Sequence, residues 1–285
     1  MGWASVGEVR DALAREHYLA DEALATAVYL AGAIDQPLLL EGEAGVGKTE
    51  TARAAAAARD ARLVRLQCHE GIDVHHALYD WDWSRQLLAL RAAEHGRPAP
   101  QLYSREFLVR RPLLEALEAD DDVVLLIDEV DRADDAFEAF LLEFLSDFQI
   151  TIPELGTVAA TERPVVVMTS NRTRELHDAL KRRCLYHWIP FPEAERERRI
   201  VGARAPGVDE AAAAALVEAV TNARGLKLLK RPGIAESIEW AQGAHVLAEE
   251  GAAWPDALRR SLGLLLKEQD DVETALAHAE LLGLT

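Results

Sequence analysis

The chain has 285 residues, of which 49% are hydrophobic and 28% charged, so it is long enough for a sizeable core and two domains. Its formal net charge of −18, from 49 acidic and 31 basic residues, argues against sequence-independent binding to nucleic acids or anionic membranes. Its two cysteines cannot build a disulfide framework, and without a long apolar run or a signal-peptide pattern we expect a cytoplasmic protein that does not span a membrane.

The first two thirds of the chain alternate helices with short apolar strands. We predict helices over residues 5–15, 21–34, 48–59, 84–94, 106–118 and 134–146. We predict strands over residues 37–41, 62–67, 123–127, 164–169 and 184–189, and a hairpin that pairs 149–152 with 157–159. This alternation predicts an α/β fold with a five-stranded parallel sheet and helices on both faces.

The chain becomes wholly helical after Pro190 and Pro192. We predict helices over residues 193–203, 209–224, 233–248, 255–266 and 270–282. The predicted boundary therefore separates an α/β domain over residues 1–190 from an all-α domain over residues 191–285.

A phosphate-binding loop follows the first predicted strand. The pattern G-x-x-x-x-G-K-[ST] is fitted by Gly42, Glu43, Ala44, Gly45, Val46, Gly47, Lys48 and Thr49, with Glu50 next in the helix. Glycines allow successive N–H groups to turn inward on a phosphate, and the helix start adds positive partial charge. Lys48 is predicted to reach the outer phosphates, and the Thr49 hydroxyl to hold Mg²⁺. The loop therefore predicts binding of ATP with Mg²⁺.

Two other predicted strands end in polar side chains. Asp128 and Glu129 follow the strand at 123–127, and Asn171 follows the strand at 164–169. Ligands of open α/β sheets bind at the carboxyl ends of strands, so these residues are expected to converge on the loop. Asp128 is predicted to hold Mg²⁺ through water, and Glu129 to polarise a water for attack on the γ-phosphate. Asn171 is predicted to hydrogen-bond that water or the γ-phosphate, so the set indicates ATP hydrolysis.

The order of GEAGVGKT, VVLLIDEVDR, VVVMTSN and DALKRRC resembles an AAA+ ATPase. The strings ITIPELGTV and RRCLYHWIPFP are similar to the MoxR family. The string LQCHEGIDVHHALYDWDWSRQLL looks most like the MoxR subgroup associated with maturation of carbon monoxide dehydrogenase, a molybdenum hydroxylase. The resemblance extends from about Tyr18 onward, and it implies a P-loop AAA+ core followed by an all-α lid.

The resemblance also implies a hexameric ring in which a neighbour's arginine completes each ATP site. Arg183 is the first choice for that arginine and Arg182 the second, and the alternative is that both pair with surface acids. The family expects a further arginine in the lid, just inside a helix start where this chain has Gly233. Arg231 is the preferred substitute, because the following Pro232 suits a first helical turn.

The implied function is a MoxR-type chaperone that couples ATP hydrolysis to metal or cofactor insertion into a client metalloenzyme. The resemblance further implies an adaptor with a von Willebrand A domain. Three alternatives stay open: a binding module whose assembly is controlled by nucleotide, a nucleic-acid motor, which the net charge disfavours, and a small-molecule kinase.

Two groups of residues allow more than one interpretation. Cys68, His69, His75 and His76 suggest a metal site, but their spacing matches no zinc pattern and favours scattered polar residues. Trp81 and Trp83 are expected in packing, or else in a loop that grips a client, and the hairpin at 149–159 has the same two readings.

Overall fold

The computed structural model describes residues 3–94 and 100–285, and the chain divides into two compact units. Unit 1 contains Met1–Ala12, Asp21–Glu41 and Thr51–Trp188, and unit 2 contains Leu13–Ala20, Gly42–Glu50 and Ile189–Thr285. The phosphate-binding loop therefore belongs with the C-terminal helices by its contacts, whereas Asp128, Glu129 and Asn171 belong to unit 1.

The main sheet has five strands in the order β2-β5-β8-β1-β9, and it confirms the predicted fold class. Its strands are β1 (Leu38–Gly42), β2 (Arg62–Gln67), β5 (Val123–Asp128), β8 (Val165–Ser170) and β9 (Leu185–Ile189). The pairs β2–β5, β5–β8 and β1–β8 are parallel. All six residues of β5 are buried, as expected for a central strand covered on both faces. The registers place Gln67 opposite Asp128 and Glu41 opposite Ser170, so the carboxyl ends of four strands lie at one edge.

Helices cover this sheet and bury its apolar side chains. Those before residue 190 are α1 (Val6–Arg15), α2 (Glu22–Ala33), α3 (Lys48–Ala58), α4 (Val74–Ala77), α5 (Trp83–Glu94), α6 (Pro112–Leu117), α7 (Asp135–Asp147) and α8 (Asp178–Lys181), with 3₁₀ turns η1 (Arg105–Phe107) and η2 (Val130–Arg132). Helix α7 shows the principle: Asp134 caps its first turn, and Phe137, Leu141 and Phe144 enter the core on one side.

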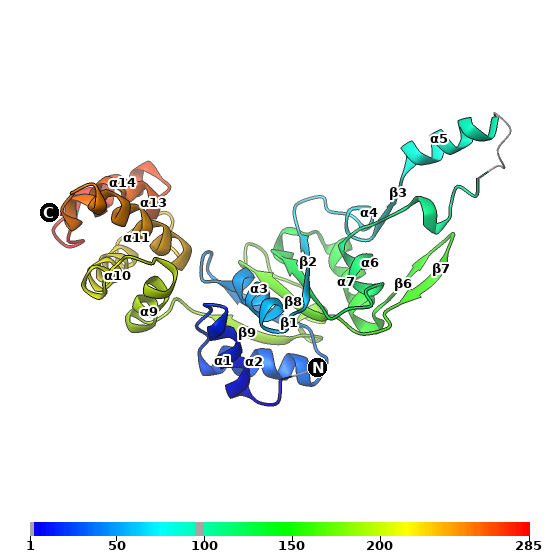
Figure 1. The fold of residues 1–285 in the computed structure, drawn as a ribbon, viewed down its shortest axis with the longest axis horizontal. Helices are drawn as coiled ribbons and strands as arrows, with labels where there is room; N and C mark the ends of the chain where they lie inside the picture. Colours follow the sequence, from blue (N-terminus) through cyan, green and yellow to red (C-terminus); the bar gives the residue numbers. More distant parts are fainter. Residues whose placement is uncertain (1–2, 95–99) are drawn as a thin grey trace. The chain divides into compact units, whose positions relative to one another are not determined.

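Two small antiparallel sheets project from the body of unit 1 (Figure 1). The hairpin of β6 (Gln149–Ile152) and β7 (Gly156–Ala159) confirms the sequence prediction. The second sheet pairs β3 (Tyr79–Trp81) with β4 (Leu108–Arg110), and the prediction of one helix over residues 106–118 is wrong. Extended backbone at Arg111 separates β4 from α6, and Pro112 begins α6 at the position where a missing N–H costs least.

Unit 2 is built on C-terminal helices, which confirms the helical reading. They are α9 (Ala194–Arg204), α10 (Glu210–Gly225), α11 (Ile234–Glu249), α12 (Trp254–Arg260), α13 (Leu262–Leu265) and α14 (Gln269–Ala277). Trp240 is fully buried in their core, and its indole N–H donates to the Leu258 carbonyl at 3.0 Å. The helix predicted over 255–266 is divided at Ser261, and α14 ends five residues before the predicted 282. Among the described residues, no helix has the length and apolar character needed to cross a membrane.

Candidate functional site

The phosphate-binding loop connects β1 to α3 and has the conformation that its glycines predict. Gly45 and Gly47 have φ angles of +76° and +96°, and residues other than glycine rarely adopt such a backbone conformation. The Lys48 ammonium is 6% exposed and donates to the carbonyls of Gly42 at 2.9 Å and Glu43 at 2.6 Å. A buried cation that donates to the loop's own backbone carbonyls suits a site for an anion, because phosphate oxygens can replace those carbonyls.

The end of β5 carries the two predicted carboxylates in different environments. Asp128 is 2% exposed, accepts the Thr169 hydroxyl at 2.6 Å and pairs with the Arg65 guanidinium at 2.6 Å. Glu129 is partly exposed and has a left-handed backbone with φ of 54°, and its N–H donates to the Thr169 hydroxyl at 2.9 Å. Such a conformation costs a non-glycine residue about 1–3 kcal/mol and is typical of functional sites.

Three side chains hold the Glu129 carboxylate. The Asn171 amide donates to it at 3.3 Å, which brings two predicted site residues together, and the Arg132 guanidinium lies 3.3 Å away. The Gln67 amide donates to it at 3.1 Å from the end of β2. Sequence reasoning missed Gln67, although its position at a strand end is the signal that identified Asn171.

A buried carboxylate fixes the turn that carries Asn171. Asp131 is 2% exposed and accepts the N–H groups of Asn171 at 3.2 Å and Thr173 at 2.8 Å. It also accepts the Thr173 hydroxyl at 2.7 Å. The segment after β5 and the turn after β8 are therefore joined directly beside Glu129, and Asp131 is a second residue that the sequence analysis did not identify.

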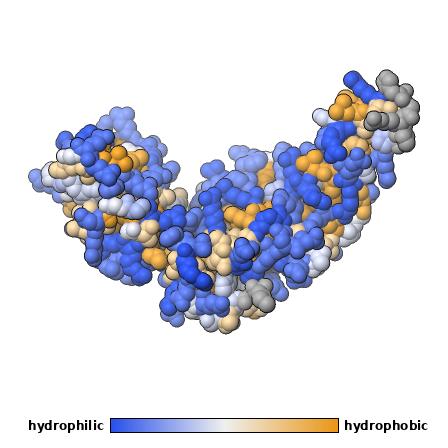
Figure 2. Space-filling view, in the orientation of Figure 1, coloured by the Kyte–Doolittle hydropathy of each residue, from blue (hydrophilic) through white to orange (hydrophobic). Residues whose placement is uncertain are grey.

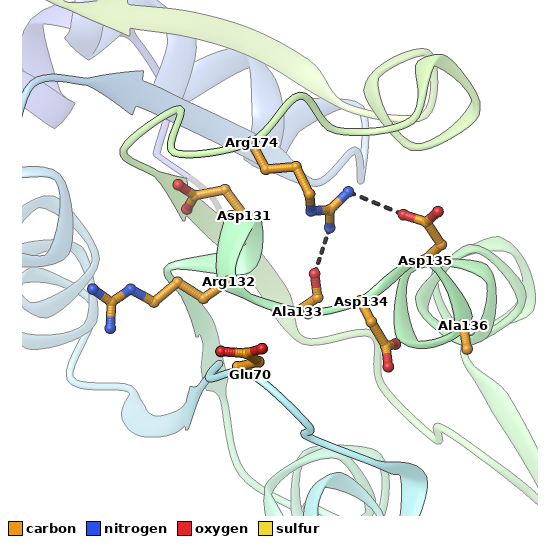
Figure 3. A pocket seen from close by; sticks show the side chains of 8 residues that line it. All are labelled: Glu70, Asp131, Arg132, Ala133, Asp134, Asp135, Ala136 and Arg174. Carbon is orange, nitrogen blue, oxygen red and sulfur yellow. Dashed lines mark hydrogen bonds and ion pairs between the residues drawn. The ribbon is translucent and has the colours of Figure 1, made fainter.

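An open pocket of about 780 Å³ lies beside these residues (Figure 3). It is lined by Glu70, Asp131, Arg132, Ala133, Asp134, Asp135, Ala136 and Arg174. Arg174 crosses from the turn after β8 to the start of α7, where its guanidinium pairs with Asp135 and with the fully buried Glu138. Four carboxylates face two guanidinium groups in this lining, so the pocket favours a cationic group.

The predicted arginines have different surroundings. The Arg183 guanidinium is anchored on its own subunit, where it donates to the Ser146 hydroxyl at 3.0 Å and to the Ala179 carbonyl at 3.3 Å. Arg182, beside it, is exposed and makes no side-chain contact with the described part of the chain. Arg231 is likewise exposed, and no contact joins its side chain to the phosphate-binding loop within the described residues.

The remaining residues of the phosphate-binding loop differ in their exposure. Glu50 pairs with Arg204 at 3.1 Å, Thr49 is partly buried, and Glu43 and Ala44 are exposed. Val46 is 3% exposed and packs its side chain inward.

The tryptophans and the cysteine of the segment after β2 lie in different environments. Trp81 is 8% exposed and packs edge-to-face on Tyr103, whereas Trp83, at the start of α5, is 61% exposed. Burial raises the pKa of the Cys68 thiol to about 12, helped by the nearby carboxylates of Asp128, Asp131 and Glu129. The described residues contain no group of histidines, cysteines and carboxylates arranged to hold a metal ion.

Comparison with solved structures finds the same fold in AAA+ proteins. The RuvB Holliday junction branch migration motor of Thermotoga maritima matches with a TM-score of 0.50 at 16% identity, covering 92% of this chain and 71% of that chain. A proline-to-glycine mutant of that RuvB matches with a TM-score of 0.52 at 16% identity, covering 95% of this chain and 73% of that chain. These identities establish a common fold only.

Comparison with curated proteins finds no significant match. The family model of the AAA domain, dynein-related subfamily, matches residues 37–184, which contain the phosphate-binding loop, the β5 carboxylates and Asn171. The chain therefore belongs to the AAA domain family, in its dynein-related subfamily.

Proposed function

We propose that this protein hydrolyses ATP with Mg²⁺ as its cofactor. The observation that carries the proposal is the Glu129 carboxylate, which the Asn171 amide holds at 3.3 Å at the sheet edge where β5 and β8 end. Nucleotide binding requires only the loop from Gly42 to Thr49, but hydrolysis also needs a base and a group that orients water. The backbone strain at Glu129 supports a functional role for this carboxylate.

Each residue has a defined task in this proposal. Lys48 exchanges its two loop carbonyls for phosphate oxygens, and Thr49 and Asp128 are the residues assigned to the metal. Glu129 accepts the proton of the attacking water, and Asn171 keeps the carboxylate and the water in one orientation. Bound Mg²⁺ supplies charge neutralisation at the phosphates. Gln67 and Arg132 compete for the same carboxylate, so their release accompanies catalysis.

We further propose a hexameric ring in which the segment directly after α8 lends an arginine to the neighbouring subunit. The acidic excess of the pocket beside Glu129 supports this, because an incoming guanidinium matches its carboxylates. Arg183 was preferred from the sequence, yet its guanidinium is engaged on Ser146 and Ala179, whereas Arg182 has no such contact among the described residues. Single alanine variants of each therefore decide between them.

The cellular role that we propose is a cytoplasmic MoxR-type chaperone. It matures a client metalloenzyme, a molybdenum hydroxylase such as carbon monoxide dehydrogenase, with an adaptor that carries a von Willebrand A domain. The exposed apolar side chains of α5 support a client or adaptor surface, and hydrophobic residues are visible on this projecting part of unit 1 (Figure 2). These exposed apolar residues of α5 are Trp83, Leu87, Leu88 and Leu90. Residues 1–190 are proposed as the nucleotide-binding domain and 191–285 as the lid, with Arg231 as the lid cation.

Three variants test the ATPase proposal. Lys48→Ala is expected to lose nucleotide binding, because the buried ammonium is the only cation in the loop. Glu129→Gln is expected to bind ATP but to lose turnover, and alanine at the ring arginine is expected to do the same. ATP binding with no hydrolysis by the wild-type protein, alone and with its adaptor, would refute the proposal.

The Glu129→Gln variant also separates the proposed chaperone from a nucleotide-controlled binding module. Client maturation that survives this variant favours the binding module, because assembly alone is then sufficient. Affinity capture with the ATP-locked variant identifies the client. The fold shared with RuvB makes stimulation of turnover by DNA or RNA the measurement for a nucleic-acid motor, and the net charge of −18 predicts none.

A further inference from the structure

The phosphate-binding loop touches the start of α11 backbone to backbone, with the Glu236 carboxylate also close to Gly45. The Ile234 N–H donates to the Gly45 carbonyl at 2.9 Å. A Cβ atom added to Gly233 would lie 2.6 Å from the Gly45 Cα and 2.9 Å from the Ala44 carbonyl oxygen. A Cβ atom added to Gly45 would in turn lie 2.9 Å from the Gly233 Cα. These separations are too short for any side chain, so both positions require glycine on grounds of space.

This contact fixes the direction of the loop's donors. In a trans peptide, the carbonyl of one residue and the N–H of the next point in opposite directions. The carbonyls of Ala44 and Gly45 face the start of α11, so the N–H groups of Gly45 and Val46 point away from it. Those N–H groups belong to the set that a P-loop directs at phosphate.

The start of α11 is itself held firmly. The Gly233 N–H donates to the Glu236 carboxylate at 3.0 Å. The Ser237 hydroxyl donates to Glu197 at 2.8 Å, and Glu197 is fully buried and paired with Arg224. Gly233 has φ of −86° and ψ of −174°, an extended conformation open to every residue. Glycine is therefore needed at this position for the close approach and not for its backbone freedom.

We propose that Gly233 is a positioning residue for the nucleotide. By lacking a side chain it seats α11 directly on the phosphate-binding loop, and the Ile234 N–H then holds the Gly45 and Val46 donors in place. The inference rests on the proposed nucleotide binding at this loop. The contact between Ile234 and Gly45 thereby couples the start of α11 to the loop.

Two matched pairs of variants test the inference in the full chain. Ile234→Pro removes the N–H and places the proline Cδ against the Gly45 carbonyl, so it separates the helix start from the loop. The helix itself is kept, because proline is accepted at the first helical position and Gly233 is already extended. Ile234→Ala keeps the N–H and truncates the same side chain. Gly233→Ala introduces the clash, and Gly225→Ala, where no atom lies within 4 Å of the added Cβ, is its control.

The probe is a fluorescent ATP analogue with Mg²⁺, titrated at equilibrium. We expect Ile234→Pro to bind at least fivefold more weakly than Ile234→Ala, because the loss of one net hydrogen bond alone corresponds to about fivefold. Gly233→Ala is expected to bind at least tenfold more weakly than Gly225→Ala. The rise in Tm caused by the analogue, measured from each variant's own nucleotide-free Tm, should be smaller in Ile234→Pro and Gly233→Ala than in their paired variants.

The outcomes separate this inference from the proposed function. If the wild-type protein does not bind the analogue, nucleotide binding itself is wrong. If the wild-type protein binds it and Ile234→Pro matches Ile234→Ala, the backbone contact does not position the loop. The proline variant keeps the test decisive even where Gly233→Ala fails to fold.

Discussion

Substituting Asp131 by asparagine is expected to lower ATP turnover far more than nucleotide affinity. The Asp131 carboxylate accepts N–H groups from Asn171 and Thr173, one on each oxygen, and the Thr173 hydroxyl as well. Asparagine conserves the volume but replaces one acceptor by a donor. Either orientation of its amide therefore leaves one backbone N–H of the turn facing another donor.

The expected magnitude follows from those contacts. Losing one charge-assisted hydrogen bond and leaving a buried N–H unsatisfied costs about 2–3 kcal/mol of unfolding free energy. For a chain of this size that corresponds to a fall in Tm of about 4–12 °C. A displacement of Asn171 by about 1 Å would reduce turnover on the order of 100-fold.

The assay compares saturated ATP turnover, affinity for the fluorescent analogue and Tm. Asp209→Asn is the matched control, because Asp209 caps α10 by accepting the Ala212 N–H at 2.8 Å and does not line the pocket. Asparagine is as good an N-cap as aspartate, so this control should resemble the wild type. If Asp131→Asn lost stability but hydrolysed ATP as fast as Asp209→Asn, the Asp131 carboxylate would only stabilise the fold.

Three further experiments measure ATP turnover, stability and thiol reactivity. Gln67→Ala is expected to raise basal turnover about fivefold at unchanged affinity, because Glu129 loses a competing donor worth about 1 kcal/mol; slower turnover would mean that Gln67 helps to position the base. Trp81→Ala is expected to cost about 3–5 kcal/mol in denaturant unfolding, whereas Trp83→Ala, whose side chain is 61% exposed, should change stability by less than about 0.5 kcal/mol. Cys68, with its buried thiol and a pKa raised to about 12, should react with iodoacetamide at pH 8 only after unfolding, and rapid labelling of the native protein would contradict its placement.

The sheet was predictable because its strands are marked by local composition. A strand such as β5, buried along its whole length, appears in the sequence as an unbroken apolar run. The pairing of β3 with β4 was not predictable in this way, because it joins Trp81 to Leu108 across the whole of α5. When β3 is not considered as the partner strand, the leucines and valine near residue 110 have a spacing that also suits a helix.

The site was predictable where a motif or a strand end marked it. Glu129 and Asn171 were found by that logic, and the structure brings their side chains together. Gln67 is also a polar residue at the carboxyl end of a strand, but it belongs to no motif, so the sequence does not distinguish it from other strand-end residues. Asp131 could not be recognised, because its buried state depends on donors from a turn about forty residues further along the chain.

The contacts around Asp131 also connect the candidate base to α8, the helix that directly precedes the proposed ring arginines. Asp131 holds Thr173, and the next residue, Arg174, pairs with the fully buried Glu138 on α7. Glu138 also accepts the His177 N–H at 2.9 Å, directly before α8. Breaking a buried ion pair of this kind costs about 3–5 kcal/mol, so the segment resists local bending. We therefore expect a shift of the Asn171 turn in one subunit to move α8 and the two arginines that follow it. In the proposed ring, that movement would couple the nucleotide state of one site to the arginine that completes the next.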